Sequence, residues 1–202
     1  MDGGDLTDAL IAARCGDEAG FEALWLALQP AVLRYLRVVV GDAAEDVASE
    51  TWLQAARDLR TFDGDLTRFR VWLFRIARHR GIDDRRRLRR RAEDPYDPAL
   101  GESATTTPDS AAQALDELGT RWALEVIRSL PRDQAEAVML RVVAGLDVAQ
   151  SAQVLGKRAG AVRVATMRGL RRLANHPDVL ARVSGRPQER PGPLDSAQPE
   201  GV

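Results

Sequence analysis

The chain has 202 residues, 45% of them hydrophobic, and a formal net charge of -1, which suffices to bury the core of one ordinary domain or two small ones. No run approaches the roughly 18 to 20 apolar residues of a membrane span, and the N-terminus is acidic, so we expect a cytoplasmic protein without membrane insertion. A single cysteine excludes an intrachain disulfide. With only two histidines beside it the chain has no metal-ligand cluster, so neither a metal nor a cofactor is expected. Cys15 is predicted to be a buried or half-buried small side chain.

Charge is distributed unevenly although its net value is small. Residues 61–92 carry 11 bases and 4 acids, and residues 156–173 carry six bases and no acid, whereas residues 1–60 and 93–125 have net charges of -6 and -7. Two basic blocks between acidic ones are typical of a protein that meets phosphate at two places. Solvated helix faces are the alternative interpretation.

The hydrophobic pattern predicts an all-α protein, because apolar residues recur at spacings of three and four. No segment shows the sustained period-two alternation of β-branched residues that is typical of a strand. Pro30 is expected to kink or divide the second helix. A loop at residues 60–67 precedes the fourth helix. The predicted N-terminal helices span residues 6–15, 18–39, 43–59 and about 68–87. Their predicted inward faces hold Phe21, Leu24, Trp25 and Leu28, then Val47, Thr51, Trp52 and Ala55, then Phe69, Trp72, Leu73 and Ile76.

Composition divides the chain into two domains with a linker and a tail. Residues 93–110 are rich in Pro, Asp, Ser, Thr and Gly and read as an acidic flexible linker between an N-terminal domain, 1–92, and a C-terminal domain, 111–176. The tail, 177–202, is rich in proline and predicted to be disordered, with room for a short helical turn at 177–183. Further helices are predicted at 111–129, 132–144, 148–155 and 160–174.

Residues 145–173 place a short helix, a glycine-containing turn and a longer basic helix in the order of a helix-turn-helix motif. Arginines on such a helix can read guanine edges or clamp phosphates in the major groove. An ordinary helix hairpin with a charged exterior is the alternative. The scaffold face is predicted to hold Val162, Ala165, Thr166, Gly169, Leu170 and Leu173, and the opposite face Arg163, Met167, Arg168, Arg171 and Arg172.

Aromatic residues are interleaved with arginines between residues 59 and 91. Such a segment suits single-stranded DNA, because rings and guanidinium planes stack on unpaired bases while the positive charge follows the backbone. By spacing, Trp72, Leu73 and Ile76 belong to the core, which leaves the arginine face, including Arg75 and Arg78, and the loop at 60–67 for DNA.

The segments AAEDVASETWLQAARDL (43–59), FRVWLFRIARHRGIDDRRR (69–87) and LPRDQAEAVMLRVVAGL (130–146), followed by the helix-turn-helix, resemble an extracytoplasmic-function sigma factor of the sigma-70 family. The resemblance covers about Phe21 to Leu173, and FRxWLFRIARH is its most specific piece. It implies sigma region 2 in the first domain and sigma region 4 in the second. It also implies a non-enzymatic subunit that directs core RNA polymerase to specific promoters and helps open them.

The resemblance carries roles over to individual positions. Contact with the beta-prime clamp of core polymerase is implied for Glu45, Asp46, Glu50 and Trp52, with a solvated acidic face as the alternative for Asp46 and Glu50. Binding of the -10 element is implied around Phe62, Asp63 and Arg70, with Arg75 and Arg78 on the adjoining arginine face. Binding of the -35 element is implied for Lys157, Arg158, Arg163, Arg168, Arg171 and Arg172. The implied partners are promoter DNA, core polymerase through its beta-prime clamp and beta flap, and an anti-sigma factor.

Departures from the family pattern lie in the helix-turn-helix, where Ser151 and Lys157 replace apolar residues and Ala165 and Thr166 replace larger ones. Three rival functions are an operator-binding helix-turn-helix regulator that works without polymerase, a polymerase-binding adaptor that no longer reads DNA, and an enzyme. An enzyme is disfavoured because the chain has no phosphate-binding glycine loop and no catalytic pairing at usable spacing.

Overall fold

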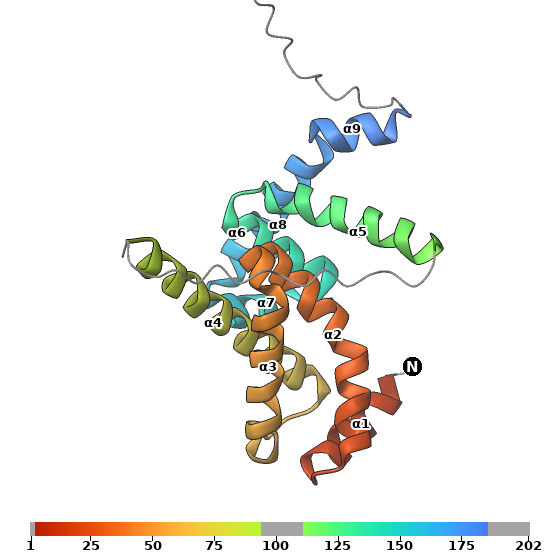
Figure 1. Cartoon of the computed structure of the whole chain (residues 1–202), viewed down its shortest axis with the longest axis vertical. Coiled ribbons are helices and arrows are strands. Elements are labelled where there is room, and N and C mark those ends of the chain that lie inside the picture. The colour runs from red at the N-terminus through yellow and green to blue at the C-terminus, as the bar shows by residue number, and fades with distance from the viewer. Residues whose placement is uncertain (1–2, 94–110, 186–202) are drawn as a thin grey trace, which may run out of the picture.

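The computed structural model describes residues 3–93 and 111–185, and every regular element in these ranges is a helix, which confirms the all-α prediction (Figure 1). The predicted linker, apart from Glu93, and most of the predicted tail lie outside the described residues. The N-terminal half contains α1 (Gly3–Arg14), α2 (Glu18–Val40), η1 (Gly41–Ala43), α3 (Ala44–Asp58), η2 (Leu59–Thr61) and α4 (Leu66–Glu93). The C-terminal half contains α5 (Ala111–Arg128), α6 (Arg132–Val138), η3 (Met139–Val143), α7 (Val148–Leu155), α8 (Ala159–Ala174) and α9 (Pro177–Val183).

Helix boundaries follow local signals. The Asp17 side chain caps α2 by accepting from the backbone N–H groups of Ala19 and Gly20, and a capping box between Asp147 and Gln150 begins α7. The helix α4 extends past its predicted end to Glu93, since the arginines of its last turns are good helix formers.

Pro30 does not divide α2, so that part of the prediction is wrong. The proline lies on the exposed side of the helix. A carbonyl that loses its N–H partner there can be hydrated by water, which lowers the cost of a proline inside a helix.

The core of the N-terminal half is formed by α1, α2, α3 and α4, and it includes Leu10, Leu24, Val47, Phe69 and Leu73. Most of the predicted inward faces are therefore buried. Trp25 is the main exception, with 41% of its surface exposed, because it lies about 100° around the helix from Leu24. Cys15 is also exposed, contrary to expectation, since it follows the last turn of α1.

One helical stretch, Glu18–Thr61, contains an 18-residue window with a mean hydropathy of 1.4, so by length and composition alone it could cross a membrane. The sequence reading had found no such run. Within this stretch the side chains of Leu24, Val32 and Leu36 are fully buried against neighbouring helices. This burial is what a core helix of a folded domain requires, and core helices pass the same test.

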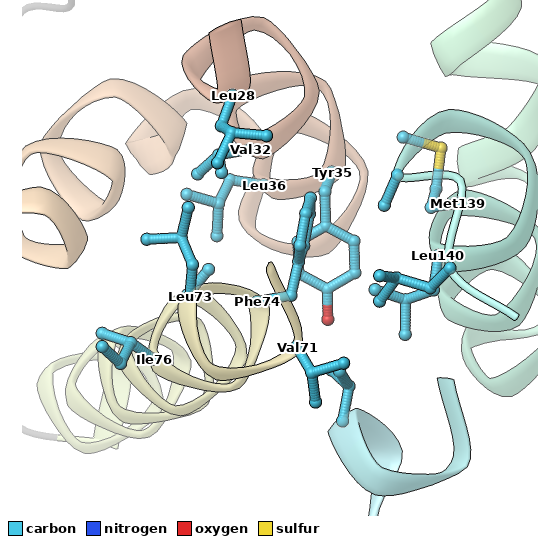
Figure 2. Packing of buried hydrophobic residues seen from close by; sticks show 14 of the residues in the cluster. Leu28, Val32, Tyr35, Leu36, Val71, Leu73, Phe74, Ile76, Met139 and Leu140 are labelled. Carbon is cyan, nitrogen blue, oxygen red and sulfur yellow. The ribbon is translucent and has the colours of Figure 1, made fainter. Parts of the chain in front are cut away.

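The two halves of the chain pack against each other, an arrangement that the sequence left open. Figure 2 shows Tyr35 of α2 and Phe74 of α4 lying between the apolar residues of their own half and Met139 and Leu140 of η3. The rings of Tyr35 and Phe74 meet edge to face, with centroids 5.6 Å apart. Burial of these side chains makes one continuous hydrophobic cluster out of both halves.

Tyr35 carries a cost within this cluster, because its buried hydroxyl has no hydrogen-bond partner among the described residues. Burial, reinforced by the negative charge of Glu136, raises the pKa of Tyr35 well above its ordinary value of 10.0. The folded protein therefore retains this proton at pH values where the unfolded chain loses it. Titration of Tyr35 therefore leaves the free energy of unfolding unchanged below pH 10 and lowers it as the pH rises further.

The variant Tyr35→Phe is expected to be more stable, with a free energy of unfolding about 1 kcal/mol higher at neutral pH, because it removes an unsatisfied hydroxyl. Above pH 10 its advantage over the unmodified protein should widen, since phenylalanine has no proton to lose. Urea titrations of both proteins at the two pH values measure this difference. A constant difference across the pH range would contradict the assignment.

Candidate nucleic-acid and polymerase interfaces

The helix-turn-helix consists of α7, a turn at Gly156 and α8. Gly156 adopts a left-handed conformation with φ 64°, which glycine tolerates and which ends α7. The helix α8 lies close against α6, since a Cβ atom on Gly169 would stand 2.8 Å from Cγ2 of Val138. Val162 is fully buried on the same face. The predicted scaffold face is therefore correct at these two positions, whereas Leu170 is exposed.

The opposite face of α8 is a surface of free arginines. Arg163, Arg168, Arg171 and Arg172 are exposed, and none of them forms an ion pair with any residue the structure describes. Arg158 stands at the N-cap, also exposed. Guanidinium groups without carboxylate partners retain their full capacity to bind phosphates or base edges.

Lys157 differs from these arginines, because its ammonium nitrogen lies 2.7 Å from a carboxylate oxygen of Asp133 on α6. Contact between Lys157 and DNA would require this ion pair to rearrange. The exposed apolar side chains on α8 include Val164, Met167 and Leu170. Of these, only Met167 was predicted from the sequence to lie on the DNA-facing side. A contact with a thymine methyl group is the role that such residues can take in the major groove.

Ser151 is fully buried on α7, and its hydroxyl lacks a hydrogen-bond partner in the part of the chain that the structure describes. The variant Ser151→Ala should raise the free energy of unfolding by about 1 kcal/mol, because an unsatisfied polar group leaves the core. Thermal unfolding followed by circular dichroism measures the change. Ser49→Ala, at an exposed position of α3, is the control and should change stability by less than about 0.5 kcal/mol.

The predicted -10 loop is shorter than expected and is supported by aromatic packing. Phe62 is half-buried, and its ring centroid lies 5.0 Å from that of Trp72 and 5.7 Å from that of Phe69. The side chain of Asp63 at the loop tip is fully exposed, with Arg14 at 3.8 Å. Packing therefore fixes the loop conformation and leaves its tip open to a ligand.

The arginines of α4 face two different surroundings. Arg75 is exposed, as predicted. Arg70 donates a hydrogen bond to the carbonyl of Ala144, and Arg78 pairs with Glu136 at 2.8 Å, so both side chains contact the C-terminal half. The prediction that Arg78 points outward is wrong, because a partner remote in sequence covers it.

The predicted polymerase surface on α3 is acidic and exposed at Glu45, Asp46 and Glu50. Glu45 lies 3.3 Å from Arg37, and Glu50 lies near two arginines of α4 at 3.7 and 3.8 Å. Leu53, which the sequence reading missed, is 58% exposed and shares a face with Asp46 and Glu50 by spacing. The sequence signal that could have identified Leu53 is a leucine outside the apolar face of the helix, at the same spacing as the acidic residues.

Trp52 does not belong to this exposed surface, although the sequence placed it there as well as in the core. Only 5% of its surface is exposed, its indole N–H donates to the side-chain oxygen of Gln29 at 2.6 Å, and its ring packs edge to face on Phe21. Trp52 therefore anchors α3 to α2 from within.

Comparisons with known proteins identify the family of each half of the chain. Residues 24–91 match the family described as Sigma-70 region 2, and residues 120–173 match Sigma-70, region 4. The chain is 34% identical over 165 residues to the ECF RNA polymerase sigma factor BldN of Streptomyces coelicolor, covering 80% of this chain and 62% of BldN. It is 35% identical over 179 residues to the ECF RNA polymerase sigma factor SigD of Mycobacterium tuberculosis, covering 84% of this chain and 83% of SigD.

Solved structures show the same fold. CnrH in complex with the cytosolic domain of CnrY gives a TM-score of 0.60 at 20% identity, with 86% of this chain and 97% of that chain covered. The sigma factor RpoE in complex with the anti-sigma factor NepR from Bartonella quintana gives 0.58 at 23% identity, with 77% and 94% covered.

A region 2 fold followed by a region 4 helix-turn-helix defines a sigma factor, a protein of transcription initiation. The chain belongs to the extracytoplasmic-function group of the sigma-70 family and is an alternative RNA polymerase sigma factor.

Proposed function

We propose that the two halves divide the work of promoter recognition without any catalysis of their own. Region 4, within residues 111–176, reads the -35 element as duplex DNA, and region 2, within residues 1–92, holds melted DNA of the -10 element. The unpaired arginine face of α8 carries this proposal, because it is a basic surface with no internal use. Joining both contacts on one chain raises the effective concentration of the second.

On region 2, the exposed face of α3 is the proposed contact with the beta-prime clamp of core polymerase. Glu45, Asp46 and Glu50 supply its charge, and the exposed Leu53 adds an apolar contact. Exposed polar and apolar side chains together on one helix face suit a specific protein interface. The beta flap is the proposed partner of region 4.

For the -10 element, the proposed contacts are the exposed Asp63, the adjoining Phe62 and the exposed Arg75. Arg70 and Arg78 are engaged with the C-terminal half, so we propose that they reach DNA only after the two halves separate. Lys157 and Arg158 join the four exposed arginines of α8 as -35 contacts.

An anti-sigma partner is proposed for this chain in the cytoplasm. The solved neighbours CnrH and RpoE were each captured with a second protein, which for RpoE is named as an anti-sigma factor. A pull-down from native extract under non-inducing conditions tests this partner. Recovery of polymerase subunits alone would count against it.

Run-off transcription with purified core polymerase, this protein and a genomic template library tests the function, with mapping of the 5′ ends. New start sites that share two short motifs at fixed spacing are expected. Binding to core without start sites would favour an adaptor, and specific binding to duplex DNA without core would favour an operator-binding regulator.

A further inference from the structure

A cavity of about 290 Å3 lies between α4 of region 2 and α6 of region 4. Its polar lining contains five guanidinium groups and two carboxylates, from both halves of the chain. They belong to Arg78, Arg85, Arg86, Arg89, Arg132, Asp133 and Glu136.

Both carboxylates are already used. Glu136, with 4% of its side chain exposed, accepts from Arg78 through one oxygen at 2.8 Å and from Arg132 through the other at 2.6 Å. Asp133 pairs with Lys157 at 2.7 Å. Arg86 pairs with Asp83 of its own helix at 3.5 Å. The two carboxylates of the lining are therefore already paired, and two of its guanidinium groups remain without a carboxylate.

These two groups are Arg85 and Arg89. Arg85 donates only a long hydrogen bond, 3.5 Å, to the carbonyl of Val39, and Arg89 makes no ion pair with any residue in the described ranges. Burial, together with the nearby charges of Arg132 and Arg89, lowers the pKa of Arg85. Positive charges thus repel one another in a partly enclosed space, and a bound anion would reduce this repulsion.

We propose that this cavity binds a small multivalent oxyanion of the diphosphate class, free or as part of a nucleotide. Guanidinium groups pair with phosphate oxygens through two parallel hydrogen bonds, and adjacent phosphates match the several arginines that converge there. The cavity, at about 290 Å3, leaves room for a compact anion.

Because residues of both halves line the cavity, the site exists only while regions 2 and 4 are packed together. A bound diphosphate therefore stabilises the packed arrangement by linkage. The anion would thereby hold Arg78 on Glu136 and away from promoter DNA, which makes the site a point where a cellular metabolite controls the factor.

Isothermal titration calorimetry measures the affinity of the full-length protein for inorganic pyrophosphate without polymerase, at a constant ionic strength of about 0.15 M. Arg89→Gln should weaken binding about tenfold, since a charge-assisted pair is lost. Arg90→Gln, exposed on the same helix but outside the lining, makes the same charge change and should leave the affinity within about twofold. Neither substitution removes a buried side chain, and circular dichroism checks that both variants fold.

The NMR signals of the arginine side-chain N–H groups locate the anion. Shifts at Arg85, Arg89 and Arg132 support the proposal. Equal losses in the Arg89 and Arg90 variants, or shifts confined to Arg168, Arg171 and Arg172 on α8, would overturn it. A short DNA duplex that displaces pyrophosphate from Arg85 and Arg89 would also overturn it, by assigning the cavity to DNA backbone phosphate.

Discussion

Replacing Glu136 by alanine is expected to lower the free energy of unfolding by about 3 kcal/mol, because Arg78 would remain largely buried without its partner. The loss falls on the contact between the halves, since Arg78 lies on α4 and Glu136 on α6. Urea titration measures it. Glu136→Gln should lose less, because the amide keeps an acceptor for one arginine.

Glu125→Ala is the matched control for this prediction. Its carboxylate pairs with Arg128 at 3.6 Å with both side chains at least half exposed, so its removal should cost less than about 1 kcal/mol. Similar losses in the Glu136 and Glu125 variants would show that the buried pair does not hold the halves together. A double-mutant cycle with Arg78→Ala then isolates the pairwise energy.

Removing Arg171 and Arg172 together, as Arg171→Ala and Arg172→Ala, should reduce promoter-dependent transcription about a hundredfold. Each arginine that contacts a base or a phosphate contributes about 1 to 3 kcal/mol to binding. Both side chains are exposed, so the fold should persist. Run-off transcription over a series of salt concentrations measures the loss, and the salt dependence should become shallower.

Arg121→Ala with Arg128→Ala, exposed on α5 outside the helix-turn-helix, makes the same change in net charge and is the control. If this pair loses as much activity as the α8 pair, the effect comes from overall charge and the -35 assignment fails. Binding of each variant to core polymerase, measured separately, distinguishes lost DNA contact from lost assembly.

Most helices were predictable from sequence, because capping residues and hydrophobic spacing are local signals. The bounds of α7 agree with the prediction, and α8 begins one residue earlier than predicted. The basic face of α8 was likewise visible, since residues three and four apart in a helix share a face. Pro30, Trp25 and Cys15 were misjudged, because a residue type alone does not say which side of a helix is covered.

The sequence by itself determined the all-α class, the order of the two regions and the position of the helix-turn-helix. Only the tertiary structure decided that Arg70 and Arg78 contact the C-terminal half, that Trp52 is internal and that a cavity lined by arginines lies between α4 and α6. Arg70 and Arg78 meet partners 74 and 58 residues away. Helical periodicity fixes which side chains share a face, but the partner of that face depends on packing between distant segments, which no local pattern encodes.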